Sequence, residues 1–143
     1  MTMRVAAKNP PYAGIKVWFV SEIDDRALLP GLARRELRAW MGDHPALADL
    51  EAIASELVTN AVLHGEGAWV RMSLRAVEER ERPFWRLSVV DPGLSASVPM
   101  PRMPGPHETT GRGLWMVDSL TNGCWETSLT QMGERVVSAL LPR

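Results

Sequence analysis

The sequence predicts an α/β (α+β) fold: a two-layer sandwich in which a mixed, mostly antiparallel β-sheet carries three α-helices on one face. Three observations support this prediction. Residues 46–67 repeat apolar side chains at the three-and-four spacing of an amphipathic helix. Residues 70–76 and 85–89 alternate apolar and polar side chains, as half-buried strands do. Residues 124–129 and 135–141 have the composition of a final hairpin.

The composition is that of an ordinary globular domain. The chain has 143 residues, of which 45% are hydrophobic and 23% charged, which suits one substantial core. A formal charge of -1 argues against a direct nucleic-acid partner or an anionic membrane surface. Cys124, the single cysteine, excludes a disulfide framework and is expected to be a small buried residue. Without a membrane-spanning run or a signal-peptide core, we expect a cytoplasmic protein.

The first 41 residues divide into an arm, a strand and a helix. Residues 1–14 contain Pro and Gly and little pattern, so we expect a flexible arm before a single domain at 15–143. Residues 15–19 alternate, which predicts a strand that buries Ile15, Val17 and Phe19. The helix that follows should begin near Leu28, because a proline at position 30 is tolerated only in a first turn.

The long helix at 46–67 carries polar residues beside its apolar stripe. Glu56, Asn60 and His64 lie one turn apart and so form a ladder along one side of the helix. A carboxylate and a carboxamide in this arrangement can hold a hydrated Mg²⁺ and a reacting hydroxyl. The alternative is a solvated helix face with no ligand, which is the commoner meaning of an isolated E-x-x-x-N pair.

The second predicted strand pair ends on a carboxylate. Residues 78–82, EERER, form a charged hairpin tip, and Asp91 has the parity of the apolar residues in the strand before it. A carboxylate on the core-facing side needs a hydrogen-bond donor. Asp91 either starts an Asp-Pro-Gly turn and accepts a hydrogen bond from its own backbone, or lies at the bottom of a pocket and accepts a hydrogen bond from an N–H of a ligand.

A long irregular segment separates this strand from the third predicted helix. Residues 92–110 hold five prolines and no periodicity, which is typical of a lid or a disordered segment. Gly111, Arg112 and Gly113 then precede a helix at 114–120. Free N–H groups at such a turn suit a phosphate, although a tight turn without a ligand is the commoner explanation of a lone G-x-G.

The order of these signals resembles a known superfamily. An E-x-x-x-N-x-x-x-H helix, a strand ending D-x-G, a long loop and a G-x-G before a helix resemble the ATP-binding (Bergerat) domain of the gyrase, Hsp90, histidine kinase and MutL (GHKL) superfamily. Within it, ELVTNAVLHG and GRGLWMVD resemble the small bacterial anti-sigma factor serine/threonine kinases of the RsbW and SpoIIAB type. Two motifs differ: Ser95 replaces a frequent second glycine, and Gly133-Glu134-Arg135 replaces a Gly-Lys-Thr-like turn near the phosphates. Glu134 would weaken triphosphate binding if it pointed inward, and Arg135 would compensate for its charge.

The resemblance implies a role for each matching residue. Asn60 would ligate Mg²⁺, and Glu56 would act as general base or orient the attacking hydroxyl. The residues that would bind the nucleotide are, besides Asn60, Asp91 at the adenine amino group, Gly93 under the purine, Gly111 and Gly113 at the phosphates, and Arg112 as a countercharge. His64 receives no chemical role.

The function implied is an ATP- and Mg²⁺-dependent protein serine/threonine kinase. It would phosphorylate an anti-sigma factor antagonist and sequester a sigma factor, and members of that branch are often homodimers. Two alternatives stay open. One is a nucleotide-binding regulatory module without phosphotransfer, and the other is a structural interaction domain with a dead pocket.

Overall fold

The strands form one antiparallel sheet in the order β1-β2-β3-β5-β4. The computed structural model describes residues 13–64, 67–93 and 112–143. The strands are β1 (Gly14–Phe19), β2 (Trp69–Glu79), β3 (Arg82–Asp91), β4 (Trp125–Leu129) and β5 (Arg135–Pro142). The predicted fold class is confirmed, and every strand pairing in the described ranges is antiparallel rather than mixed.

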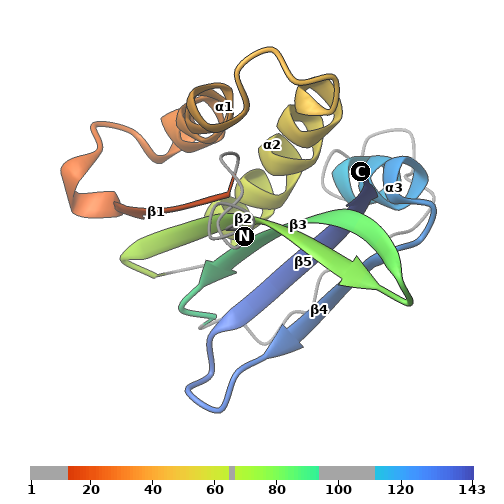
Figure 1. Ribbon diagram of the computed structural model, residues 1–143. Coiled ribbons are helices and arrows are strands. Elements are labelled where there is room, and N and C mark those ends of the chain that lie inside the picture. The colour runs from red at the N-terminus through yellow and green to blue at the C-terminus, as the bar shows by residue number, and fades with distance from the viewer. Residues whose placement is uncertain (1–12, 65–66, 94–111) are drawn as a thin grey trace, which may run out of the picture.

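Three α-helices cover one face of this sheet (Figure 1). They are α1 (Leu29–Met41), α2 (Leu47–His64) and α3 (Arg112–Thr121). Alternate residues of β2, β3 and β5 point to the helices and are buried, as the period of two in a strand requires. The core therefore lies between the two layers.

The helix boundaries follow local sequence signals. α1 begins at Leu29 and has Pro30 in its first turn, as predicted. α2 buries a stripe at the three-and-four spacing against the sheet, formed by Leu50, Ile53, Ala54, Leu57, Val58 and Ala61. The side chains of α1 and α2 also pair, since Arg34 Nη1 donates to Ser55 Oγ at 2.9 Å.

β1 exists where the sequence predicts it, but its buried face is the opposite one. Trp18 is 8% exposed, whereas Ile15 and Phe19 are 61% and 49% exposed. Trp18 pairs with Val70 of β2, whose side chain is also buried, and this register turns the indole to the helices. The prediction was wrong because apolar side chains occupy both faces of this strand, so the alternation itself does not say which face is covered.

Both predicted hairpins are present. The β2–β3 turn is confined to Arg80 and Glu81, which have φ values of 51° and 64°, so the charged tip is a tight turn with positive φ at both central residues. β4 and β5 form the second hairpin, and β5 lies between β3 and β4.

Two expectations about the last third of the chain need correction. Cys124 is exposed, because it lies outside β4 in the connection from α3. α3 begins at Arg112 rather than after Gly113, so two residues of the expected glycine turn belong to the first helical turn. Of the expected arm at 1–14, residues 1–12 lie outside the described residues and Gly14 already belongs to β1. Of the expected loop at 92–110, residues 94–110 lie outside the described residues. Within the described ranges, none of the helices combines the length and apolarity required to cross a membrane.

Candidate functional site

Asp91 and Arg135 face each other at the centre of the sheet. Asp91 is the last residue of β3, Arg135 is the first of β5, and the antiparallel register pairs the two directly. Both have the parity of the core-facing residues, and they are 3% and 2% exposed. The sheet therefore places a carboxylate and a guanidinium under the helices as a cross-strand pair.

Every oxygen of the Asp91 carboxylate has a donor. Arg135 Nε and Nη2 donate to Oδ2 at 3.1 and 2.9 Å, and the backbone N–H of Gly93 donates to Oδ1 at 2.8 Å. The interpretation of Asp91 as a turn start that accepts from its own backbone is thus confirmed. The donor that its burial requires comes mainly from Arg135, and a carboxylate with three hydrogen bonds keeps about one free acceptor site out of four.

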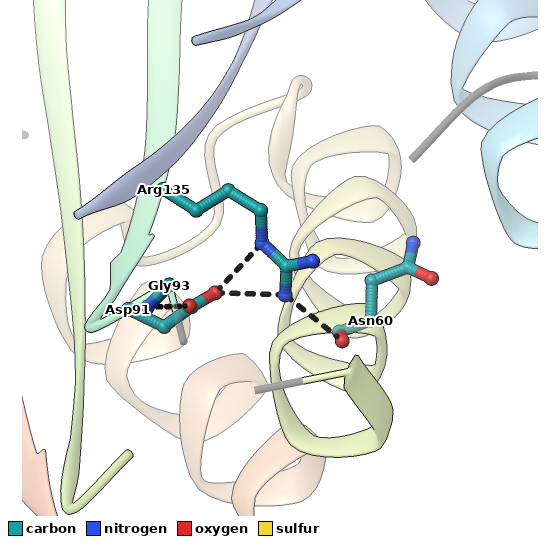
Figure 2. A network of polar contacts seen from close by, with 4 residues as sticks. All are labelled: Asn60, Asp91, Gly93 and Arg135. Carbon is teal, nitrogen blue, oxygen red and sulfur yellow. Dashed lines mark hydrogen bonds and ion pairs between the residues drawn. The ribbon is translucent and has the colours of Figure 1, made fainter. Parts of the chain in front are cut away.

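Arg135 connects the sheet to α2 (Figure 2). Its Nη2 also donates to the backbone carbonyl of Asn60 at 3.4 Å, so one guanidinium contacts the end of β3 and the middle of α2. Its Nη1 is buried and has no hydrogen-bond partner within residues 13–64, 67–93 and 112–143. The charge of Arg135 is paired with Asp91, whereas the sequence suggested that it would compensate for Glu134 near the phosphates.

Asn60 presents an unpaired carboxamide. The residue is 8% exposed, and its side chain points away from Arg135 (Figure 2). Among the described residues none forms a hydrogen bond with this amide, although the Asn60 backbone carbonyl accepts one. The Asn60 amide atoms do not belong to the fully buried polar atoms without a partner in the described ranges, so the amide keeps some access to solvent and is open to a ligand.

Glu56 lies one turn before Asn60 on α2, as the helical spacing predicts. It is partly buried, and burial raises the pKa of its carboxyl above the ordinary value of 4.5. A carboxylate with a raised pKa is a stronger base, which is the property a general base needs near neutral pH.

Gly93 marks a close approach between two segments of the site. Its φ is +70°, and a Cβ there would lie 2.3 Å from the carbonyl oxygen of Gly133 and 2.8 Å from the backbone N of Arg135. Glycine is required here because the chain end of β3 packs against the β4–β5 turn. This contact holds Asp91 and Arg135 in register.

The remaining predicted site residues are only partly described. Arg112 and Gly113 occupy the first turn of α3, whose first backbone N–H groups have no partner within the helix. Gly111 lies outside the described residues, as do the side chains of Arg112 and His64. α3 packs against α2, so the start of α3 belongs to the same side of the sheet as Asn60.

The sequence placed Arg135 at the start of a strand near the middle of the sheet, as the structure has it, but did not find its partner. Its parity with the buried Val137, Ala139 and Leu141 was a usable signal, because it puts the guanidinium on the core side of β5. Only the pairing of β5 with β3, across 44 residues of sequence, shows that Asp91 is its partner.

The match of this chain to the histidine kinase-like ATPase domain family covers residues 23–138. The chain belongs to this family. It is thereby a member of the GHKL superfamily, as the motif order suggested. No curated protein matches the chain. Among solved structures, the chain is similar to the histidine kinase domain of the E. coli osmosensor EnvZ, determined by NMR, at 16% identity and a TM-score of 0.42. That similarity covers 77% of this chain and 83% of the EnvZ domain.

For a histidine kinase-like ATPase domain, the donor set fits a nucleotide better than a bare metal ion. No cluster of three or more His, Cys, Asp or Glu side chains that could bind a metal is found within 13–64, 67–93 and 112–143. Magnesium usually keeps several waters and takes only one or two protein oxygens beside phosphate oxygens. The carboxamide oxygen of Asn60 can serve as one such protein oxygen.

Proposed function

We propose that this protein binds ATP with Mg²⁺ and transfers the γ-phosphoryl group to a serine or threonine of a partner protein. The observation that carries the proposal is the carboxamide of Asn60, which has no hydrogen-bond partner among the described residues and lies one helical turn after Glu56. The backbone carbonyl of Asn60 accepts from Arg135, which in turn binds the buried Asp91. Membership in the histidine kinase-like ATPase domain family supports ATP as the ligand.

Different residues of the site would bind the base and the phosphates of the nucleotide. The free acceptor site of Asp91 suits an N–H of the base, and the Asn60 oxygen suits the metal that neutralises phosphate charge. The first turn of α3 offers backbone N–H groups to the phosphates. Glu56, with its raised pKa, is then the group placed to orient or deprotonate the attacking hydroxyl.

The partners of this proposal come from the resemblance to anti-sigma factor kinases. The substrate would be an anti-sigma factor antagonist, and the protein would sequester a sigma factor, as a homodimer. The partly buried Glu56 favours this kinase over a module that only binds nucleotide, because a binding module needs no base beside the metal ligand.

The first experiment measures Mg·ATP binding by calorimetry in wild type, Asn60→Ala and Glu56→Gln. We expect wild type to bind, Asn60→Ala to lose affinity, and Glu56→Gln to bind within about threefold of wild type, since a base acts in the transition state rather than in binding. Ser55→Ala serves as a control for changes on α2, because its hydroxyl contacts α1.

The second experiment incubates each variant with ATP labelled at the γ-phosphate and with anti-sigma factor antagonist proteins. The kinase predicts labelled serine or threonine that disappears in Glu56→Gln while ATP binding persists. Binding without labelled product for any antagonist would select the regulatory module instead. If wild type does not bind Mg·ATP, the remaining alternative is a structural interaction domain with a dead pocket.

A further inference from the structure

The pair formed by Asp91 and Arg135 is costly for a structural contact. Both side chains are almost fully buried, and Nη1 of the guanidinium has no hydrogen-bond partner in the part of the chain that the structure describes. A buried ion pair often contributes no more stability than apolar side chains of similar size, and an unsatisfied N–H lowers it further. Stability by itself therefore does not account for an arginine at position 135.

The contacts of the pair define what Asp91 can still accept. The two Arg135 donors occupy Oδ2, and the Gly93 N–H takes one of the two sites on Oδ1. About one acceptor site remains, on Oδ1. Both guanidinium donors converge on one oxygen and the Gly93 N–H holds the other, so the three hydrogen bonds together fix the plane of the carboxylate.

We propose that Arg135 is a positioning residue for base recognition: it fixes Asp91 so that its one free acceptor site selects a nucleobase with an exocyclic amino group. This inference rests on the proposed nucleotide binding and names the residue that gives it base specificity. Arg135 acts through Asp91, which contacts the base.

The anchoring of Arg135 supports this role (Figure 2). Its Nη2 contacts the Asn60 carbonyl on α2, and its backbone N lies beside Gly93 in a contact too close for any Cβ. The guanidinium is thus held by α2, while the backbone of residue 135 is held against Gly93, and both contacts define the position of the Asp91 carboxylate. A shorter or apolar side chain at 135 would leave the carboxylate held by one backbone N–H.

The test compares ATP with purine riboside triphosphate, which lacks the exocyclic amino group, by calorimetry in the presence of Mg²⁺. Wild type should prefer ATP by about tenfold or more, the effect of one hydrogen bond to a charged acceptor. Arg135→Met should lose that preference to within about twofold, while its affinity for purine riboside triphosphate changes by less than about threefold. Arg135→Lys should restore part of the preference, because an ammonium donates to the carboxylate from one nitrogen where the guanidinium donates from two.

Two further variants separate positioning from general damage. Arg86→Met removes an exposed arginine that pairs with Glu79, and it should keep the wild-type preference. The double variant Asp91→Asn with Arg135→Met contains no buried unpaired charge and should fold, which melting curves will show. In the double-mutant cycle, Arg135→Met should cause no further loss of preference once Asp91 is changed.

Several outcomes would overturn the proposal. Arg135→Met could keep the preference for ATP, or it could lose affinity for both nucleotides equally, which would indicate a direct ligand contact or a structural role. Wild type could bind both nucleotides equally, in which case this inference fails and nucleotide binding stands. If wild type binds neither, the proposed function fails as well.

Discussion

At the scale of single residues, the ion pair between Asp91 and Arg135 predicts how substitutions change the free energy of unfolding. Asp91→Ala leaves a guanidinium that is 2% exposed without its partner, so we expect a loss of about 3–5 kcal/mol in the free energy of unfolding. The double variant Asp91→Leu with Arg135→Met should return to within about 2 kcal/mol of wild type, because it buries no charge. Urea unfolding measures both.

The matched control is the exposed ion pair of Arg86 and Glu79, whose side chains are 38% and 47% exposed. Glu79→Ala should cost about 0–1 kcal/mol. If Asp91→Ala lowered the free energy of unfolding by as little as Glu79→Ala does, the expected cost of leaving Arg135 buried without its partner would be contradicted. Nucleotide binding by Asp91→Ala must therefore be measured together with its folding, because an unfolded variant also loses binding.

The raised pKa of Glu56 predicts a pH-dependent stability. Below pH 4.5 the carboxyl is protonated in the folded and the unfolded state and burial costs nothing. As the pH rises through the raised pKa, the folded protein must ionise a partly buried carboxyl, and stability is lost. Glu56→Gln should therefore raise the melting temperature at pH 7 and have little effect at pH 4.

Melting curves at the two pH values provide the measurement. Glu78→Gln, at an exposed position of β2, should leave the melting temperature unchanged at both. Equal effects of Glu56→Gln at pH 4 and pH 7 would show that the carboxyl of Glu56 is not desolvated.

At the level of elements, the site depends on the contact between the end of β3 and the β4–β5 turn. Gly93→Ala would place a methyl group 2.3 Å from the Gly133 carbonyl oxygen, at a φ of +70°. We expect a loss of about 2–4 kcal/mol, from backbone strain and from separation of the two segments, together with weaker Mg·ATP binding.

Gly42 offers the comparison for this prediction. Its φ is +60°, and a Cβ there would have no neighbour within 4 Å, so Gly42→Ala tests the conformational cost without the contact. Because its ψ of −125° lies outside the left-handed helical region, Gly42→Ala should cost about 1–3 kcal/mol and leave nucleotide binding unchanged. Equal losses for Gly42→Ala and Gly93→Ala, in chemical unfolding, would mean that the contact at Gly93 is unimportant.

The orientation of β1 gives a second prediction for an element. Trp18 is buried and Phe19 is half exposed, so Trp18→Ala should cost about 3–5 kcal/mol and Phe19→Ala less than about 1 kcal/mol. Unfolding in urea distinguishes the two faces. The reverse order of costs would restore the face predicted from sequence.

For the whole molecule, nucleotide binding should appear as global stabilisation. A ligand that binds only the folded state at one hundred times its dissociation constant adds about 2.7 kcal/mol. We expect Mg·ATP to raise the melting temperature of wild type accordingly, and the effect to shrink in Asn60→Ala. No shift at saturating Mg·ATP would favour a domain with a dead pocket.

The sequence by itself determined the elements and much of the fold. The apolar period of 46–67, the alternation of 70–76 and 85–89, and the proline at position 30 are local signals, and α2, β2, β3 and the start of α1 follow them. The parity that put Asp91 on the core side of its strand is also local, because alternation is a property of one strand. Glu56 and Asn60 lie one turn apart for the same reason.

Only the tertiary structure determined which partners these residues contact. Which face of β1 is covered depends on its register with β2, and apolar residues on both faces leave that register undetermined in the sequence. The donor for Asp91 is Arg135, 44 residues away, and it is found only once β5 pairs with β3. The need for glycine at 93 arises from the backbone of the β4–β5 turn. Local periodicity fixes where a side chain points, whereas a site needs partners from distant segments, and only packing brings those together.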